Sequence, residues 1–129
     1  MPSPYELLGG DAGIRRLAEA FYDAMDEMPQ AAGIRRMHAD DLSEVKQKLY
    51  EYLSGWLGGP RLYYEKYGTV CLVGVHHPYR IGPAERDQWL QCMEEALKRV
   101  GVDGELRSRL LRAFFQMADF LRTDDGSAD

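Results

Sequence analysis

Apolar residues recur every three or four positions along most of this 129-residue chain, and this spacing predicts amphipathic α-helices. The first long stripe predicts a helix that Asp11 caps and that Pro29 breaks or restarts. Its apolar members are Ile14, Leu17, Phe21, Met25 and Met28. Before this helix, residues 4–8 predict a short turn that a pair of glycines stops. After it, residues 31–37 predict about two further helical turns.

Three further stripes predict three more long helices. The first begins at Leu42, after a polar connection over residues 38–41, and ends at a Gly-Gly-Pro sequence. The second covers residues 83–100, with a proline at its favourable first position, and the third covers residues 103–121. Their apolar members are Leu42, Val45, Leu49, Leu53 and Trp56; Trp89, Met93, Ala96 or Leu97, and Val100; and Leu106, Leu110, Phe114, Met117 and Leu121.

Residues 61–82 show no long helical period. The run from Val70 to Val73 could form a strand, but no second strand is available to pair with it, so we expect an irregular loop that leads into one short helix. The acidic, small-residue tail at 123–129 predicts disorder, which leaves residues 1–122 as a single domain. The pattern predicts an all-α fold, either an up-down bundle or a two-over-two sandwich with something filling its middle.

Composition narrows the class of protein. With 21 acidic and 16 basic side chains the formal net charge is −5, which argues against a nucleic-acid partner. There is no run of 18 apolar residues to cross a membrane, and the N-terminal sequence lacks the features of a signal peptide, so we expect a cytoplasmic protein. Cys71 and Cys92 are too few for a disulfide framework and are expected to be reduced, packed thiols.

A pair of adjacent histidines, His76 and His77, precedes Pro78. The residue before a proline is pushed out of the α region, so His77 is expected to leave the helical turn that carries His76. An imidazole at the end of a short helix, opposite a long helix that carries Trp89, is a geometry in which an all-α protein holds haem iron. A histidine near a turn is more often a surface or capping residue, so the pair alone leaves both interpretations open.

A series of short motifs occurs in a specific order along most of the chain. They are Tyr5-Glu6-Leu7-Leu8-Gly9-Gly10, Phe21-Tyr22, His38-Ala39-Asp40-Asp41-Leu42, Gly58-Gly59-Pro60 followed by Tyr63, His76-His77-Pro78-Tyr79, and Glu85-Arg86-Asp87-Gln88-Trp89-Leu90-Gln91-Cys92-Met93. In this order and spacing the chain resembles the group II truncated haemoglobins. The resemblance implies a truncated globin fold, a two-over-two helical sandwich around haem b, with iron open to O₂, CO and NO.

The resemblance also implies roles for individual residues. His76 matches the proximal ligand of the haem iron, and His77 falls at a variable position of the family. Tyr22, His38 and Trp89 match the distal ligand-binding positions. The expected haem-pocket residues are Phe21, Val45, Leu49, Tyr63, Tyr79 and Met93.

The chemistry of these residue types agrees with the resemblance. A neutral imidazole is a standard axial ligand of haem iron, and a tyrosine hydroxyl or an indole N–H can donate a hydrogen bond to a bound gas with partial negative charge. Structural alternatives stay open at this point. Tyr22 could be half-buried with its hydroxyl in water, Trp89 could be core packing, and His38 could be a solvated loop residue.

The chain departs from the family where one or two arginines commonly precede the proximal histidine and pair with a haem propionate. Here the four residues before His76 are Leu-Val-Gly-Val. The candidates for a replacement are Tyr63, Lys48, Lys66, His77 and Arg80. Of these we favour Tyr63.

Three functions are compatible with the sequence. The first is an O₂-binding haem protein with slow O₂ release from a five-coordinate iron, acting in oxygen transport or in a redox-linked role with a reductase. The second is a haem enzyme with peroxidase-like or NO-dioxygenase-like activity; for the peroxidase chemistry, His38 is the distal residue suited to take a proton. The third is a helical interaction module without haem. The sequence allows a monomer or a homodimer.

Overall fold

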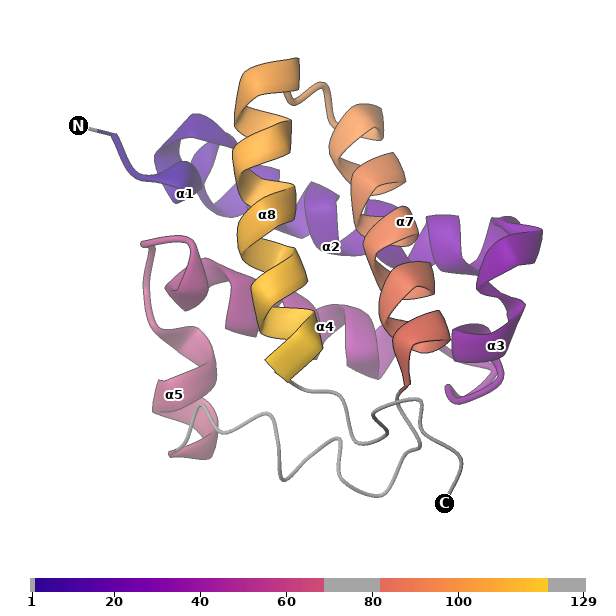
Figure 1. Ribbon diagram of the computed structural model, residues 1–129. Coiled ribbons are helices and arrows are strands. Elements are labelled where there is room, and N and C mark those ends of the chain that lie inside the picture. Colours follow the sequence, from indigo (N-terminus) through magenta and orange to yellow (C-terminus); the bar gives the residue numbers. More distant parts are fainter. Residues whose placement is uncertain (1, 69–81, 121–129) are drawn as a thin grey trace.

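The computed structural model describes residues 2–68 and 82–120, and the described residues form helices and loops with no strand among them (Figure 1). The helices are α1 (Pro4–Leu7), α2 (Gly10–Glu27), the 3₁₀ turn η1 (Pro29–Ala31), α3 (Ala32–Arg35), α4 (Ser43–Trp56), α5 (Leu62–Tyr67), α7 (Pro83–Arg99) and α8 (Gly104–Phe120). The all-α prediction is confirmed. The candidate strand at 70–73 and the acidic tail at 123–129 lie outside the described residues.

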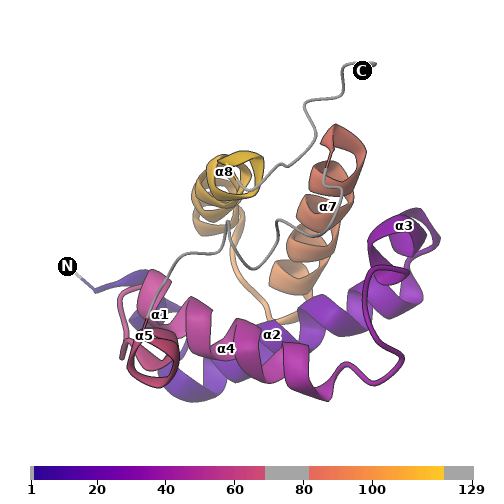
Figure 2. The same ribbon diagram turned by 90° about the horizontal axis from the view of Figure 1, so that it is seen from below.

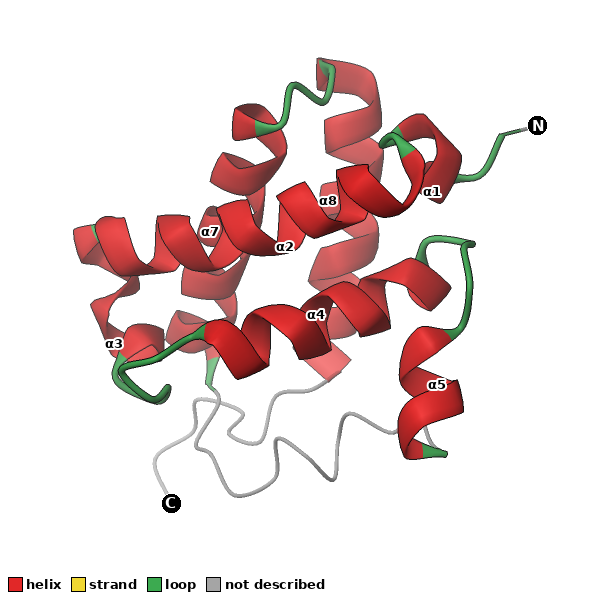
Figure 3. Ribbon diagram, turned by 180° about the vertical axis from the view of Figure 1, so that it is seen from behind, coloured by secondary structure: helices red, strands yellow, loops and turns green. Residues whose placement is uncertain are grey.

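The long helices form two layers. Helices α2 and α4 pack together in one layer, and α7 and α8 pack together in the other, with α2 in contact with α7 (Figure 2). From behind, α2 and α4 lie in front of the α7–α8 pair and cross it at a large angle (Figure 3). This arrangement is the two-over-two sandwich and not the up-down bundle.

The core lies where the two layers meet. About half of the predicted stripe residues are fully buried in it, and the other described ones pack against it while partly covered, because the apolar face of each long helix points at the opposite layer. The largest fully buried apolar side chains are Phe21, Phe114, Ile14, Leu17, Met25, Leu53, Met93 and Leu97. Cys92 is also buried and forms no disulfide, which confirms the prediction for this thiol; Cys71 lies outside the described residues.

The structure corrects two local predictions. Asp11 does not cap α2, because the helix begins one residue earlier, at Gly10, after Gly9 adopts a left-handed conformation with φ of 104°. Asp11 lies in the first turn, where a carboxylate is favourable near the positive end of the helix. The irregular loop expected after residue 60 is wrong for residues 62–67, which form α5 because Tyr63 buries its ring against Tyr52 of α4.

Candidate functional site

Tyr22 of α2 lies in an aromatic cluster between the two layers. Its side chain is 8% exposed, and its ring meets Phe21 edge-on, with centroids 4.9 Å apart, and lies 5.6 Å from the ring of His38. The alternative of a half-buried tyrosine with its hydroxyl in water is therefore wrong. Burial raises the pKa of Tyr22 well above its ordinary value, so the hydroxyl is neutral at physiological pH and can donate a hydrogen bond.

His38 lies in the turn after α3 and is partly buried, not a solvated loop residue. Its Nδ1 is 2.8 Å from the carbonyl oxygen of Ile34. A carbonyl oxygen can only accept, so Nδ1 carries the hydrogen and donates it. In the neutral ring Nε2 is then an acceptor, and in the protonated ring it is a second donor. The structure thus brings Tyr22 and His38 together from α2 and from the segment after α3.

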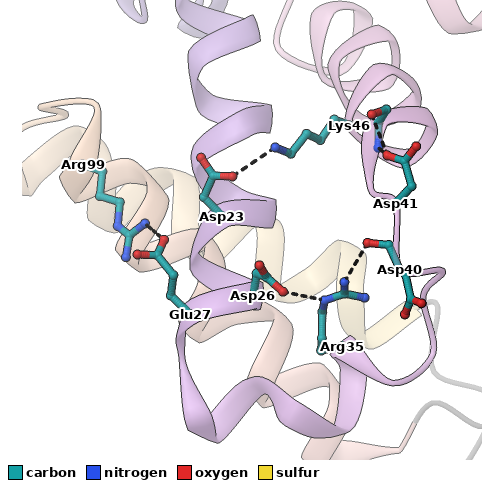
Figure 4. A network of polar contacts seen from close by, with 9 residues as sticks. Asp23, Asp26, Glu27, Arg35, Asp40, Asp41, Lys46 and Arg99 are labelled. Carbon is teal, nitrogen blue, oxygen red and sulfur yellow. Dashed lines mark hydrogen bonds and ion pairs between the residues drawn. The ribbon is translucent and has the colours of Figure 1, made fainter.

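A guanidinium group fixes the chain that follows His38. Arg35 donates from Nε to Asp26 of α2 at 3.0 Å and from Nη2 to the carbonyl of Asp40 at 3.0 Å (Figure 4). It also donates from Nη1 to the carbonyl of Ala39 at 2.9 Å. Sequence reasoning missed this role, because two of the three acceptors are backbone carbonyls, which leave no residue-type signal. The contacts tie the segment after His38 to the helix that carries Tyr22.

Trp89 approaches the same cluster from α7. Its ring lies 5.0 Å from Phe21 and 5.6 Å from Phe114, so Phe21 lies between Trp89 and Tyr22 in this row of rings. Phe114 in turn stacks on Trp56 of α4, with centroids 4.6 Å apart. The indole of Trp89 is only partly buried, so it contributes to packing and retains an exposed side.

An apolar surface adjoins this cluster. Val45, Leu49 and Trp56 of α4 pack against the core together with Trp89 and Met117, and the described residues cover each of them only in part. Phe21 and Met93 are 0% exposed, so they pack within the core and do not form part of this apolar surface. Partly covered apolar side chains beside a buried hydroxyl donor fit a flat apolar group such as haem, which carries a small polar ligand on one face.

Three of the residues predicted as partners for the haem propionates lie on described helices: Lys48 on α4, and Tyr63 and Lys66 on α5. Tyr63 is 8% exposed and contacts the rings of Tyr52 and Tyr67. Lys48 pairs with Glu44 at 3.1 Å; that carboxylate raises the pKa of Lys48 most, and Tyr67 and Tyr63 raise it further.

The second lysine candidate, Lys66, pairs with the buried Glu51 at 3.2 Å. The other carboxylate oxygen of Glu51 has no partner among the described residues. The remaining site candidates, His76, His77, Tyr79 and Arg80, lie outside the described residues.

The sequence profile of the bacterial-like globins matches residues 3–123. The chain belongs to the bacterial-like globin family. Among curated relatives, this globin is 34% identical over 108 residues to group 2 truncated hemoglobin YjbI of Bacillus subtilis, which covers 84% of the chain and 79% of the relative.

Solved structures agree with the family assignment. The globin superposes on a cold-adapted truncated hemoglobin from the Antarctic bacterium Pseudoalteromonas haloplanktis with a TM-score of 0.91 and 38% identity, covering 95% of this chain and 99% of the other. It superposes on a group II 2-on-2 hemoglobin from Agrobacterium tumefaciens with a TM-score of 0.88 and 40% identity, covering 95% of each chain.

These comparisons confirm the resemblance to group II truncated haemoglobins and the truncated globin fold. Haem binding and the binding of diatomic gases follow from membership of the family. Among the helices at 2–68 and 82–120, none is long and apolar enough to cross a membrane.

Proposed function

We propose that this globin binds haem b through His76 and binds O₂ with slow release, in oxygen transport or in a redox-linked role. The observation that carries the proposal is the pair formed by the buried, neutral Tyr22 and His38 beside the partly covered apolar surface of α4 and α7. The haem supplies an iron position for a diatomic gas. The side chains of the globin decide how firmly the gas is held.

The distal residues act as hydrogen-bond donors. Tyr22 keeps its proton because burial raises its pKa, so its hydroxyl can donate to a gas that carries partial negative charge. The indole N–H of Trp89 donates and has no acceptor function. His38 donates from Nε2 when its ring is protonated, since Nδ1 already serves the Ile34 carbonyl.

The haem propionates need a partner in place of the missing family arginines, and we propose Tyr63. Tyr63 lies near enough to Lys48 to raise the pKa of that lysine slightly, which supports this assignment, because a hydroxyl and an ammonium group are both donors to a carboxylate. Lys48 and Lys66 each pair with a carboxylate of the protein, so either would have to exchange that partner for a propionate.

The proximal assignment is tested by two neighbouring substitutions. His76→Ala should lose most of the bound haem, whereas His77→Ala should retain it, because the residue before a proline leaves the preceding turn. The measurement is the Soret absorbance per mole of purified protein. Equal loss in both variants, or loss in His77→Ala alone, would overturn the assignment of His76. A colourless wild-type protein would overturn the whole proposal.

The distal assignment is tested by the rate of O₂ dissociation. A hydrogen bond to a charged acceptor contributes about 1.5–3 kcal/mol, so Trp89→Phe should accelerate O₂ dissociation by roughly 10- to 150-fold. CO carries little negative charge, and its dissociation should change far less. Tyr22→Phe should also accelerate O₂ dissociation, with part of the effect compensated by His38.

Tyr64→Phe is the control for Trp89→Phe. Tyr64 is an aromatic residue that is 45% exposed on α5 and lies outside the candidate site, whereas Trp89 contacts Phe21, which touches Tyr22. The control should leave O₂ dissociation close to the wild-type rate. If Trp89→Phe changes O₂ dissociation by no more than about twofold, Trp89 is a packing residue and is not a donor to the gas.

A further inference from the structure

The short helix α3 receives its N-terminal hydrogen bond from a distant part of the chain. The first N–H groups of a helix have no acceptor within the helix, and its N-cap residue, Ala31, has no side-chain acceptor. The N–H of Ile34 instead donates to Oε1 of Gln88 on α7 at 3.0 Å, across 54 positions of sequence. The amide of Gln88 therefore does for α3 what a local capping side chain does for other helices.

Gly33 provides the space for this contact. A Cβ at position 33 would lie 2.8 Å from Oε1 and 3.1 Å from Nε2 of Gln88, too close for both groups to keep their places. The backbone at Gly33 does not require glycine, because its φ is not positive. Glycine is unfavourable inside a helix, so the close approach of Gln88 is the physical reason for a glycine here.

The residue that Gln88 holds is also the residue that orients His38. The carbonyl oxygen of Ile34 accepts from Nδ1 of His38 at 2.8 Å, and the imidazole lies against the ring of Tyr22. A continuous set of contacts thus leads from α7 through Ile34 to the Tyr22–His38 pair. Arg35 fixes the chain on the far side of His38, so the imidazole is held from both directions.

We propose that Gln88 is a positioning residue of the distal site, which fixes the Nδ1–H tautomer and the orientation of His38 through Ile34. Gly33 contributes to the same positioning role, because the absence of a side chain there leaves room for the Gln88 amide. The part of this inference that concerns gas binding rests on the proposed function. The part that concerns the imidazole of His38 is independent of it.

Three substitutions test whether Gln88 positions His38 through Ile34. Gln88→Met has similar length but no oxygen acceptor, Gln88→Glu retains an acceptor, and Gly33→Ala should displace the Gln88 amide. The atoms that a new Cβ would meet are the far end of a flexible side chain, so Gly33→Ala should fold with Gln88 swung away. Gln91→Met, on the exposed side of α7, is the matched control.

The first readout is NMR of the purified, haem-loaded protein in its diamagnetic CO form. Gln88→Met and Gly33→Ala should exchange the Ile34 amide hydrogen roughly 2- to 10-fold faster than wild type and should convert the ¹⁵N signals of His38 from one tautomer to a mixture. Gln88→Glu and Gln91→Met should retain the wild-type signals. An unchanged Ile34 exchange rate and an unchanged His38 tautomer in Gln88→Met would overturn the proposal.

The second readout is O₂ dissociation, measured in wild-type and His38→Ala backgrounds. At acidic pH, where the protonated His38 ring donates from Nε2, Gln88→Met should loosen the imidazole and accelerate O₂ dissociation by roughly 2- to 10-fold in the wild-type background. The acceleration should be much smaller when His38 is already absent. An equal effect in both backgrounds would show that Gln88 acts without His38 and would overturn the proposal. Altered His38 signals with unchanged O₂ dissociation would uphold the positioning of His38 and overturn its proposed role in gas binding.

Discussion

Tyr22 shows how burial and chemistry combine in one side chain. A phenol that is 8% exposed loses its proton less readily than one in water, so the same packing that places its ring against Phe21 and His38 also preserves its hydroxyl as a donor. A buried donor in surroundings of low polarity forms stronger hydrogen bonds than an exposed one. The ring packing and the proposed gas-binding role of Tyr22 therefore depend on the same burial.

The raised pKa of Tyr22 predicts a response to alkaline pH. Its pKa in the folded protein lies above the unfolded value of about 10, so the stability associated with the neutral hydroxyl is fully present below about pH 10 and is lost as the pH rises toward the folded pKa. Tyr22→Phe, which cannot ionise, should lose less stability between about pH 9 and pH 12 than wild type does. The measurement is Tm as a function of pH.

Tyr64→Phe is the control for this prediction, because Tyr64 is 45% exposed. Its Tm should follow the wild-type curve across the alkaline range. An alkaline loss of Tm in Tyr22→Phe as steep as that in wild type would show that another group causes the alkaline unfolding.

Single residues also show where sequence reasoning stops. Tyr22 and His38 were identified because the family carries recognisable residue types at those positions, and the structure brings the two rings together. Gln88 could not be identified in this way. Its hydrogen-bond partner is a backbone N–H 54 positions away, and a glutamine on a helix surface does not by itself indicate such a contact. Arg35 was missed for the same reason.

At the scale of elements, a polar cluster joins α2 to α4 at their edge. The hydroxyl of Tyr50 on α4 donates to Asp11 on α2, and Arg15 both pairs with Asp11 at 3.3 Å and lies over the ring of Tyr50, 4.0 Å from its centroid. Donation from Tyr50 lowers the pKa of Asp11 most, and Arg15 lowers it further. The cluster fixes the two helices of one layer against each other outside the apolar core.

Tyr50→Phe should remove the main cause of this shift. A carboxyl group whose pKa is lowered on folding stabilises the fold above its unfolded pKa of about 3.9, and this stability is lost as the pH falls through the lowered value. The variant should therefore have a lower Tm than wild type at neutral pH, and the difference should shrink as the pH falls below about 4. The measurements are Tm against pH and the pKa of Asp11 by NMR, which should rise in the variant. A difference in Tm that is constant down to about pH 2 would show that the Tyr50 hydroxyl does not act through ionised Asp11.

The observed helices agree with the predicted ones where the sequence carries a strong apolar period. They differ from the predicted ones where local backbone conformation or tertiary contacts determine the helix. The stripes of α2, α4, α7 and α8 were predictable because each buries one face. Helix α2 begins earlier than expected because Gly9 adopts a left-handed conformation, and α5 forms because the ring of Tyr63 packs against that of Tyr52. Neither feature produces a periodic pattern in the sequence.

At the scale of the whole molecule, the crossing of the two layers is the feature that periodicity could not decide. A bundle and a sandwich use the same apolar stripes, and only the contacts between distant helices distinguish them. Phe114 is central to these contacts. It is 0% exposed on α8, stacks on Trp56 of α4 and contacts Trp89 of α7, so one side chain connects both layers.

Phe114→Ala should accordingly destabilise the whole fold, since truncation of a buried phenylalanine costs about 3–5 kcal/mol through lost contacts and the cavity left behind. This is a large fraction of the roughly 5–15 kcal/mol by which a domain is stable.

The adjacent Phe115→Ala is the matched control. Phe115 is 43% exposed, and the guanidinium of Arg86 lies over its ring, 4.9 Å from the ring centroid. Its truncation should cost no more than about 1 kcal/mol, the size of an exposed cation–π contact. Free energies of unfolding from urea titration, with both variants in the same haem state, measure the two effects. Equal losses in the two variants would show that Phe114 does not join the layers, because a side chain that connects both must cost more to remove than its exposed neighbour.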